Sequence, residues 1–187
     1  PYGKSVHAPW ALIVNARITE RYGVDGSVIA ADDGIIVRLP DADAEPPGAE
    51  LFILDPDEIE PVVSREVGGS ALFASRFREA AARALLLPRL HPGKRSPLWQ
   101  QRQKASQLLD VAREHPTFPI ILETVREVLN DVYDLPALRE LAKRIERREV
   151  RVIETATDDP SPYARTLLFG YVGAFLYEGD SPLAERK

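Results

Sequence analysis

The spacing of hydrophobic positions predicts a helix followed by a hairpin at the start of the chain. Residues 7–23 place apolar side chains at helical intervals, and Gly23 suits a left-handed cap after the last turn. Residues 26–41 hold two β-rich runs that flank residues 32–34, whose Asp-Asp-Gly sequence is typical of a hairpin turn. The pattern predicts a small antiparallel sheet with this helix on one face, and residues 4–7 could be the end of a further strand.

A longer helical portion follows the hairpin. Residues 67–88 form an amphipathic pattern that Ser70 can cap. The apolar stripe of this helix consists of Phe73, Phe77, Ala80, Ala84 and Leu87. Ser96 and Pro97 suit the N-cap and the first position of another helix. Further helices are predicted over residues 96–115, 119–134 and 135–148.

The last third of the chain adds a strand-like and an apolar segment. Residues 149–156 alternate with period two, which predicts a strand that returns to the sheet. Residues 167–177 are continuously apolar or glycine, but a membrane span needs about 20 residues, so we expect a buried core helix and no membrane partner. The predicted fold class is α+β: a small antiparallel sheet with an N-terminal helix and hairpin, then a mainly helical portion and a returning strand.

The polar, proline-rich residues 41–50 are the best candidate boundary in the chain. We expect a single accessory domain over residues 1–187, with a sub-boundary near 41–50. After this loop, Asp55 and Pro56 could begin a helix. Pro61 lies too deep for that start, so the helix should kink there or begin later.

The composition excludes several classes of site. The 187 residues include no cysteine, which rules out disulfides, thiolate zinc sites and a cysteine nucleophile. The chain also has no methionine, even at position 1, which suggests a segment cut from a longer protein.

No pattern in the chain predicts an active site of its own. The sequence contains no GxxxxGK[ST] or GxGxxG loop and no GxSxG elbow. The histidines His7, His91 and His115 lack the spacing of metal ligands. Asp32 and Asp33 resemble a carboxylate pair, but the tip of a polar hairpin explains them better.

The main candidate for chemistry is a basic segment in an acidic protein. The chain carries a net charge of −5, yet residues 76–104 hold eight basic residues and one acidic residue. Such a segment suits contact with phosphates, because lysine and arginine release counterions from nucleic acid. A solvated helix face is the alternative. Charge separation of this kind favours a directional partner without saying whether it is nucleic acid or an acidic protein.

Two tryptophans could stack on a base. Trp99 lies within the basic segment, among glutamines that could add hydrogen bonds, but its helical pattern could bury it. Trp10 follows Pro9, which is expected to fix a helix start, and a tryptophan in a first turn can project beyond its helix. A tryptophan on a helical face is more often part of the core than a stacking platform, so the residues alone leave both interpretations open for Trp10.

Six phrases of the sequence, taken together and in order, resemble one known family. They are GKSVHAPWAL, DDGIIVRLPD, GGSALFASRFREAAARALLLP, RSPLWQQRQKASQLL, FPIILETVREVLNDVYDLPALRELAKRIERREVRV and PSPYARTLLFGYVGAFLYEGDSPLAER. The chain resembles the large helicase-related (Lhr-type) family of superfamily 2 helicases. The similar region is the DEAD/H-associated part that follows two motor domains and a winged helix.

The resemblance implies a role in an ATP-dependent motor that moves 3′ to 5′ on single-stranded DNA. Such proteins unwind duplexes, including RNA:DNA hybrids, and act in DNA repair. The expected partners are single-stranded DNA or an RNA:DNA hybrid, with the motor and winged-helix domains of the same polypeptide. The resemblance implies a cytoplasmic protein, with ATP and Mg²⁺ bound in the motor domains and no cofactor in this chain. By the same resemblance, this region places an aromatic side chain against a base of the tracking strand, and we favour Trp10 for that role, with Trp99 as the alternative. The expected nucleic-acid contacts are Trp10, His7, Arg76, Arg83, Lys94, Arg95, Trp99 and Arg102.

Two other functions remain as alternatives. The chain could be a structural clamp whose basic face docks on an acidic surface of the motor or of a partner protein and touches no DNA. A stand-alone hydrolase is disfavoured, because no nucleophile–base or metal constellation is present.

Overall fold

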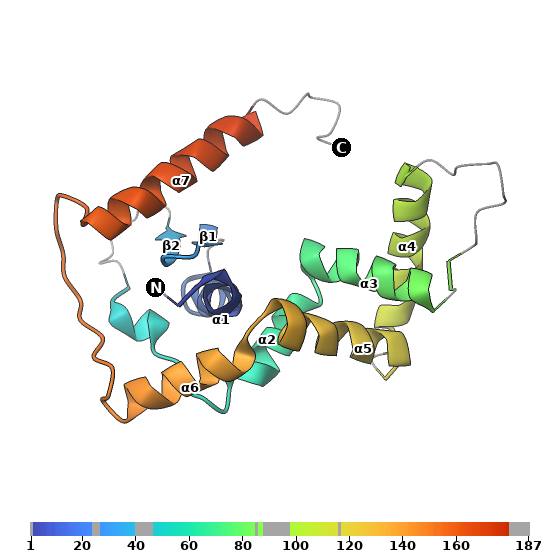
Figure 1. The fold of residues 1–187 in the computed structure, drawn as a ribbon, viewed down its shortest axis with the longest axis horizontal. Helices are drawn as coiled ribbons and strands as arrows, with labels where there is room; N and C mark the ends of the chain where they lie inside the picture. Colours follow the sequence, from blue (N-terminus) through green and yellow to red (C-terminus); the bar gives the residue numbers. More distant parts are fainter. Residues whose placement is uncertain are drawn as a thin grey trace. The chain divides into compact units, whose positions relative to one another are not determined.

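A computed structural model describes most of the chain. The described residues are 2–23, 27–39, 47–84, 86–87, 98–115 and 117–179. Within these ranges the chain has seven α-helices and one two-stranded antiparallel sheet, which confirms the predicted α+β class (Figure 1). Two compact units make up the chain: Pro1–Pro56 with Pro136–Lys187, and Asp57–Leu135.

The first unit begins with helix α1 (Lys4–Tyr22). Gly23 follows it in the left-handed conformation at φ 63° and donates its N–H to the carbonyl of Thr19, so the predicted cap is confirmed. The strand considered for residues 4–7 is wrong, because these residues form the first turn of α1 behind Gly3. Pro9 therefore lies within the helix and does not mark its start.

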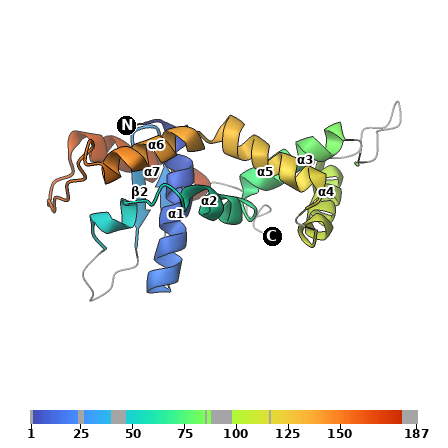
Figure 2. The same ribbon diagram turned by 90° about the horizontal axis from the view of Figure 1, so that it is seen from below.

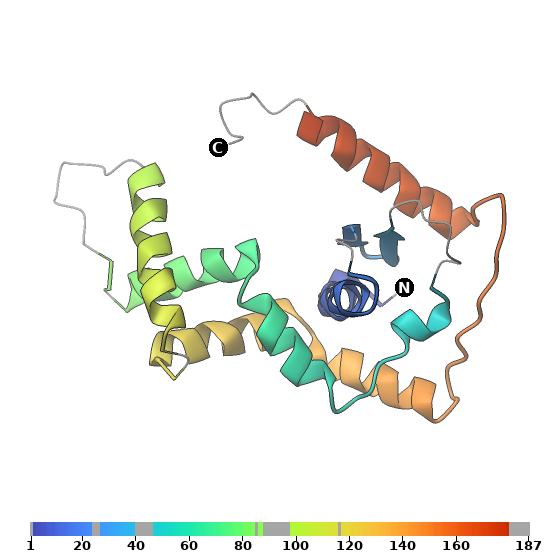
Figure 3. The same cartoon turned by 180° about the vertical axis from the view of Figure 1, so that it is seen from behind.

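The predicted hairpin is confirmed as strands β1 (Ser27–Ala30) and β2 (Ile35–Arg38). Val28 pairs with Val37, and a hydrogen bond from Ala31 N–H to the Gly34 carbonyl closes the turn over 2.9 Å. The hairpin lies between α1 and helix α7 (Pro162–Gly179) (Figures 1 and 3).

The core of the first unit forms where α1 meets the short 3₁₀ helix η1 (Ala49–Phe52). Val14, Ile18 and Leu51 are almost fully buried, and side chains of both strands pack against them. Helix α6 (Leu135–Glu146) contributes an apolar face at helical spacing, formed by Leu138, Leu141 and Ala142.

Two expectations for the end of the chain are wrong. Residues 151–157 form no strand, and the Glu154 carboxylate instead accepts the Ala49 N–H of η1 over 2.8 Å. Residues 162–172 are helical as predicted but are not a buried core helix, since Phe169 is 83% exposed. α7 uses one side to approach β2, with Arg38 donating to the Tyr171 hydroxyl over 3.2 Å.

The second unit is entirely helical over its described residues. It contains α2 (Ile59–Val67), α3 (Ala71–Arg83), α4 (Leu98–Arg113), α5 (Pro119–Glu127) and the π turn η2 (Val128–Val132). α3 packs on both α4 and α5, and Figure 2 shows these three helices side by side. The run of consecutive helices predicted from the sequence is thus confirmed.

Local signals in the sequence explain where α2 and α3 begin. α2 starts at Ile59, later than Asp55 suggested, so Pro61 lies in the first turn, where backbone N–H groups have no helical partner. The Ser70 hydroxyl caps α3 by accepting the Phe73 N–H over 3.1 Å, as predicted. Phe73 and Phe77 are buried and stacked, with ring centroids 6.5 Å apart.

Candidate nucleic-acid interface

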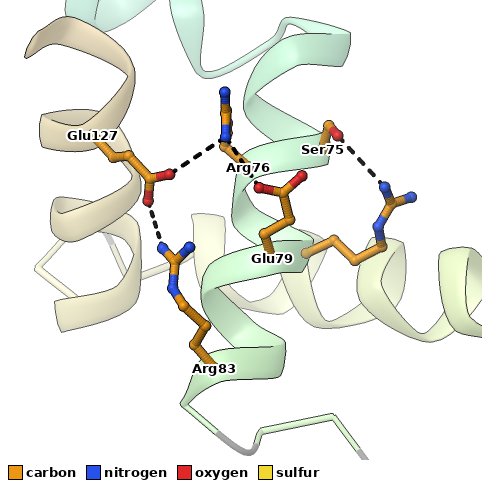
Figure 4. A network of polar contacts seen from close by, with 6 residues as sticks. Ser75, Arg76, Glu79, Arg83 and Glu127 are labelled. Atoms are coloured by element: carbon orange, nitrogen blue, oxygen red, sulfur yellow. Dashed lines mark hydrogen bonds and ion pairs between the residues drawn. The ribbon is translucent and has the colours of Figure 1, made fainter. Parts of the chain in front are cut away.

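Arg76 and Arg83 are seven positions apart and share one face of α3, and they converge on a single carboxylate (Figure 4). The Arg83 guanidinium lies 2.6 Å from Glu127 Oε2, and the Arg76 guanidinium lies 3.7 Å from Glu127 Oε1. Arg76 also contacts Glu79 over 3.1 Å. Two guanidinium groups therefore share two carboxylates, and the cluster has no net charge.

The burial of this cluster is uneven. The Glu127 side chain is 15% exposed, whereas those of Arg76 and Arg83 are 36% and 60% exposed. The carboxylate lies toward the protein and the guanidinium groups toward water. Because Glu127 is on α5, the ion pairs join α3 to α5 within one unit. Such partly exposed pairs add little to stability, typically about 0–1 kcal/mol each.

Trp99 lies on the solvent side of α4. The buried positions of this helix, Ala105, Leu109 and Ala112, form one stripe at helical spacing. Trp99 is outside this stripe and its side chain is 62% exposed, so the helical pattern does not bury it. Arg102 is exposed one turn further along, and α4 has no acidic residue before Asp110.

Trp10 has a different environment in the first unit. Its indole is half-buried against the core formed by Val14, Ile18 and Leu51. Its Nε1–H donates to the Phe52 carbonyl over 3.1 Å, which fixes the orientation of the ring. The ring also borders a shallow apolar depression, lined further by Phe52, Leu54, Leu138, Leu141, Ala142 and Ile145.

His7 is buried beside Trp10, and both of its ring nitrogens have partners. Nδ1 lies 2.7 Å from the Ala31 carbonyl, which can only accept, so Nδ1 carries the proton. Nε2 accepts the Tyr2 backbone N–H over 3.3 Å. The His7 and Trp10 ring centroids are 6.5 Å apart. His7 thus joins α1 to the tip of the hairpin, and its direct contact with nucleic acid stays a prediction.

The remaining predicted contacts divide between the two units and the undescribed part of the chain. Trp10 and His7 belong to the first unit, while Arg76, Arg83, Trp99 and Arg102 belong to the second. Lys94 and Arg95 lie outside the described residues, as do Ser96 and Pro97, the predicted cap of α4. Sequence reasoning missed Glu127, because its pairing with Arg83 spans 44 residues and leaves no local pattern.

The described residues offer neither a metal centre nor a membrane span. Within them, no group of three or more His, Asp or Glu side chains could hold a metal ion. None of their helices combines the length and apolarity that crossing a bilayer requires.

The sequence matches a known protein family over most of its length. The model of the family described as DEAD/H associated matches residues 1–164. The chain belongs to this family. Among relatives of this DEAD/H-associated chain, the Lhr helicase/probable uracil glycosylase of Mycolicibacterium smegmatis is 68% identical over 187 residues. The Lhr helicase/uracil glycosylase of Escherichia coli is 54% identical over 187 residues.

More distant relatives include the ATP-dependent helicase Lhr-Core of Saccharolobus solfataricus, 28% identical over 154 residues, which are 81% of this chain and 18% of that protein. All of this chain aligns with each of the two bacterial proteins, but it spans only 12% of their length. It therefore corresponds to one region of these helicases.

A solved structure shares the fold. The helicase Lhr of Mycobacterium smegmatis, determined bound to ssDNA and AMP-PNP, superposes with a TM-score of 0.82 at 66% sequence identity. The superposition covers 91% of this chain and 22% of that helicase chain. The DEAD/H-associated fold is thus present in a helicase that was captured on a single strand.

Proposed function

We propose that this chain is a DNA-binding accessory domain of an ATP-dependent 3′-to-5′ DNA helicase that acts in DNA repair. In this role it contacts the single strand along which the motor moves, while the whole enzyme unwinds duplexes, including RNA:DNA hybrids. The observation that carries the proposal is the 66% identity and TM-score of 0.82 to a helicase solved with ssDNA.

The exposed face of α4 supports a direct contact. Trp99 offers an indole face to solvent, and Arg102 adds a cation one turn away. Stacking on an aromatic ring contributes about 1–3 kcal/mol per base and tolerates any sequence. A cation beside the ring can neutralise the adjacent phosphate, again without reading bases. Such a contact suits a motor that must hold every sequence it crosses.

Trp10 supports the same function in another way. Its hydrogen bond to Phe52 holds the ring in one orientation, so a base that stacked on its exposed part would meet a prearranged surface. Because Trp99 is exposed, a base can reach its ring easily. Because Trp10 is held by a hydrogen bond, its ring is already oriented before a base arrives. Both therefore stay candidates for the stacking residue, and the experiment below separates them.

ATP and Mg²⁺ belong to other domains in this proposal. The described residues contain no group of three potential metal ligands, and the sequence has no phosphate-binding loop. We assign no catalytic step to this chain. Its contribution would be to hold the strand, so that hydrolysis in the motor domains produces directed movement.

Tryptophan fluorescence tests the proposal, because the sequence has only two tryptophans. Trp10→Phe leaves Trp99 as the reporter, and Trp99→Phe leaves Trp10. We expect addition of oligo-dT at low salt to quench the emission of the tryptophan that stacks on a base. Quenching of Trp99 alone would assign the contact to α4, and quenching of Trp10 alone would assign it to α1. No response from either variant, with no binding by the wild type, would sink the proposal.

Salt dependence tests the charged part of the contact. Arg102→Gln should reduce the slope of log affinity against log salt by about 0.7, the value for one phosphate on a single strand. Arg126→Gln is a matched control, because Arg126 is also exposed on a helix of the same unit. Equal salt slopes for Arg102→Gln and Arg126→Gln would mean that Arg102 does not contact a phosphate and is only a solvated surface charge.

The full-length helicase provides a functional readout. Replacing the stacking tryptophan with alanine should slow unwinding but not ATP hydrolysis. The substitution removes a contact with the strand and leaves the ATP site of the motor domains unchanged. Unwinding at the wild-type rate by both Trp10→Ala and Trp99→Ala would contradict the assignment of stacking to these residues.

The exposed face of α7 favours the structural clamp as a second candidate function. Leu168, Phe169 and Val172 are exposed on one side of this helix. An apolar face of this kind suits contact with another protein surface. A clamp of this type would give no fluorescence response to DNA, and Phe169→Ser in the full-length helicase would lower its thermal stability. An unchanged melting temperature would contradict the clamp.

A further inference from the structure

We infer that Glu127 is an internal competitor of nucleic-acid phosphate at Arg76 and Arg83, so that the arginine pair is masked in the structure and binds DNA only when Glu127 withdraws. The inference rests on the proposed DNA-binding function, and it adds regulation of one of the predicted contacts.

The arrangement of donors is that of an anion clamp. Arg76 and Arg83 are seven positions apart on α3, and both guanidinium groups reach the same carboxylate from one side (Figure 4). Each oxygen of Glu127 meets a different arginine, at 3.7 Å and 2.6 Å. A phosphodiester also presents two charged oxygens to arginine. The carboxylate therefore occupies the position that such a phosphate would take.

Access and charge make the competition feasible. The side chains of Arg76 and Arg83 are 36% and 60% exposed, so a phosphate can approach them from solvent. With Glu79 and Glu127 in place the two arginines are fully neutralised, and the cluster does not attract an anion. Withdrawal of Glu127 leaves two cations beside one carboxylate, a net charge of +1, which attracts phosphate.

The position of Glu127 along its helix suits such a withdrawal. It is the last residue of α5, and the π turn η2 follows immediately. The N–H of Tyr133 donates to the Val128 carbonyl over 2.9 Å and closes the wider turn. The carboxylate thus lies where the helical spacing changes, and π turns are common at functional sites.

Glu127→Gln tests the inference by removing the negative charge while keeping the shape of the side chain. Glu123→Gln is the matched control, because Glu123 is exposed one turn earlier on the same helix and loses the same charge. We expect Glu127→Gln to bind labelled oligo-dT at least about 5-fold more tightly than the wild type at low salt. Its salt slope should steepen by about 0.7 to 1.4, for one or two additional phosphates.

The tighter binding of Glu127→Gln should depend on Arg76 and Arg83. Glu127→Gln combined with Arg76→Gln and Arg83→Gln should lose both the tighter binding and the steeper slope. Glu127→Asp keeps the charge but shortens the side chain by one methylene, so it should give an intermediate gain and serves as a second variant if Glu127→Gln unfolds. Circular dichroism checks that each variant is folded.

The outcomes separate the two proposals. Equal affinity of Glu127→Gln and Glu123→Gln, weaker binding by Glu127→Gln, or a gain that persists without the arginines would overturn the masking role alone. Absence of DNA binding by the wild type and by every variant would overturn the proposed function together with it. A gain specific to Glu127 and dependent on both arginines supports the inference.

Discussion

The indole N–H of Trp10 donates a hydrogen bond to the backbone carbonyl of Phe52 over 3.1 Å. Arg17, two turns later on α1, donates to three neighbouring carbonyls, those of Glu50, Leu51 and Ile53. Two side chains of α1 thus provide donors to four consecutive carbonyls of η1 and the residue after it. A helix as short as η1 forms few hydrogen bonds of its own, so α1 holds it in position.

Arg17→Met should destabilise the protein by about 1–3 kcal/mol. The substitution keeps an apolar stem but removes the hydrogen-bond donors. Hydrogen bonds from charged groups contribute about 1.5–3 kcal/mol, and water can hydrogen-bond to some of the carbonyls that lose Arg17, which lowers the expected cost. The strongest of these contacts joins Arg17 to the Ile53 carbonyl over 2.6 Å. Urea unfolding followed by circular dichroism measures the loss.

Arg21→Met is the control for this change. Arg21 is exposed in the last turn of α1, one turn beyond Arg17. Its replacement should change stability by no more than about 0.5 kcal/mol, as is usual for surface positions. Similar losses for the two variants would mean that the carbonyl contacts of Arg17 contribute little.

Ser70→Ala should cost about 0.5–2 kcal/mol, the usual effect of losing an N-cap. The Ser70 hydroxyl accepts the Phe73 N–H at the start of α3, where no backbone carbonyl can replace it. Ser106→Ala, in the exposed middle of α4, should be neutral or slightly stabilising, because alanine has the higher helix propensity. Thermal unfolding of both variants distinguishes a capping role from a general effect of losing a hydroxyl.

Local signals predicted much of the fold. Ser70 as a cap, Gly23 in the left-handed conformation and the turn before Gly34 each depend on residues that are close in sequence. The chemistry of a few neighbouring side chains decides such features, so a single sequence reveals them.

Features that depend on distant partners were not predictable in the same way. Residues 149–156 have the alternation of a strand, but no described strand lies beside them, and Glu154 binds η1 instead. The side chain that meets Arg76 and Arg83 comes from α5, and nothing near either arginine indicates Glu127. Charge counts identified basic residues, but they could not show which ones an internal carboxylate neutralises.

The apolar composition of α7 also failed to predict burial. Phe169 is 83% exposed, whereas Phe73 of α3 is 2% exposed. Phe169→Ala should therefore change the stability of this chain by at most about 0.5 kcal/mol, while Phe73→Ala should cost about 3–5 kcal/mol through lost burial and a cavity. Urea unfolding compares the two variants. A large loss for Phe169→Ala would mean that its ring is covered in solution.

Tyr133 makes stability depend on alkaline pH. Burial raises the pKa of its hydroxyl above the ordinary value of 10.0, because the phenolate would lose its hydration. The unfolded chain releases this proton near pH 10.0, and the folded chain releases it only at higher pH. The free energy of unfolding is therefore insensitive to Tyr133 below that pH and falls as the pH rises toward the raised pKa.

Tyr133→Phe should remove this part of the alkaline loss. We expect the stability difference between wild type and Tyr133→Phe to be constant from about pH 7 to pH 9 and to shift in favour of the variant above about pH 10. Urea unfolding at a series of pH values measures it. Tyr163→Phe is the control, because the Tyr163 ring is exposed and meets water in both the folded and the unfolded chain. If Tyr133→Phe and Tyr163→Phe lose stability in parallel with the wild type, other groups must cause the alkaline loss, and the buried phenol of Tyr133 would then make no measurable contribution to it.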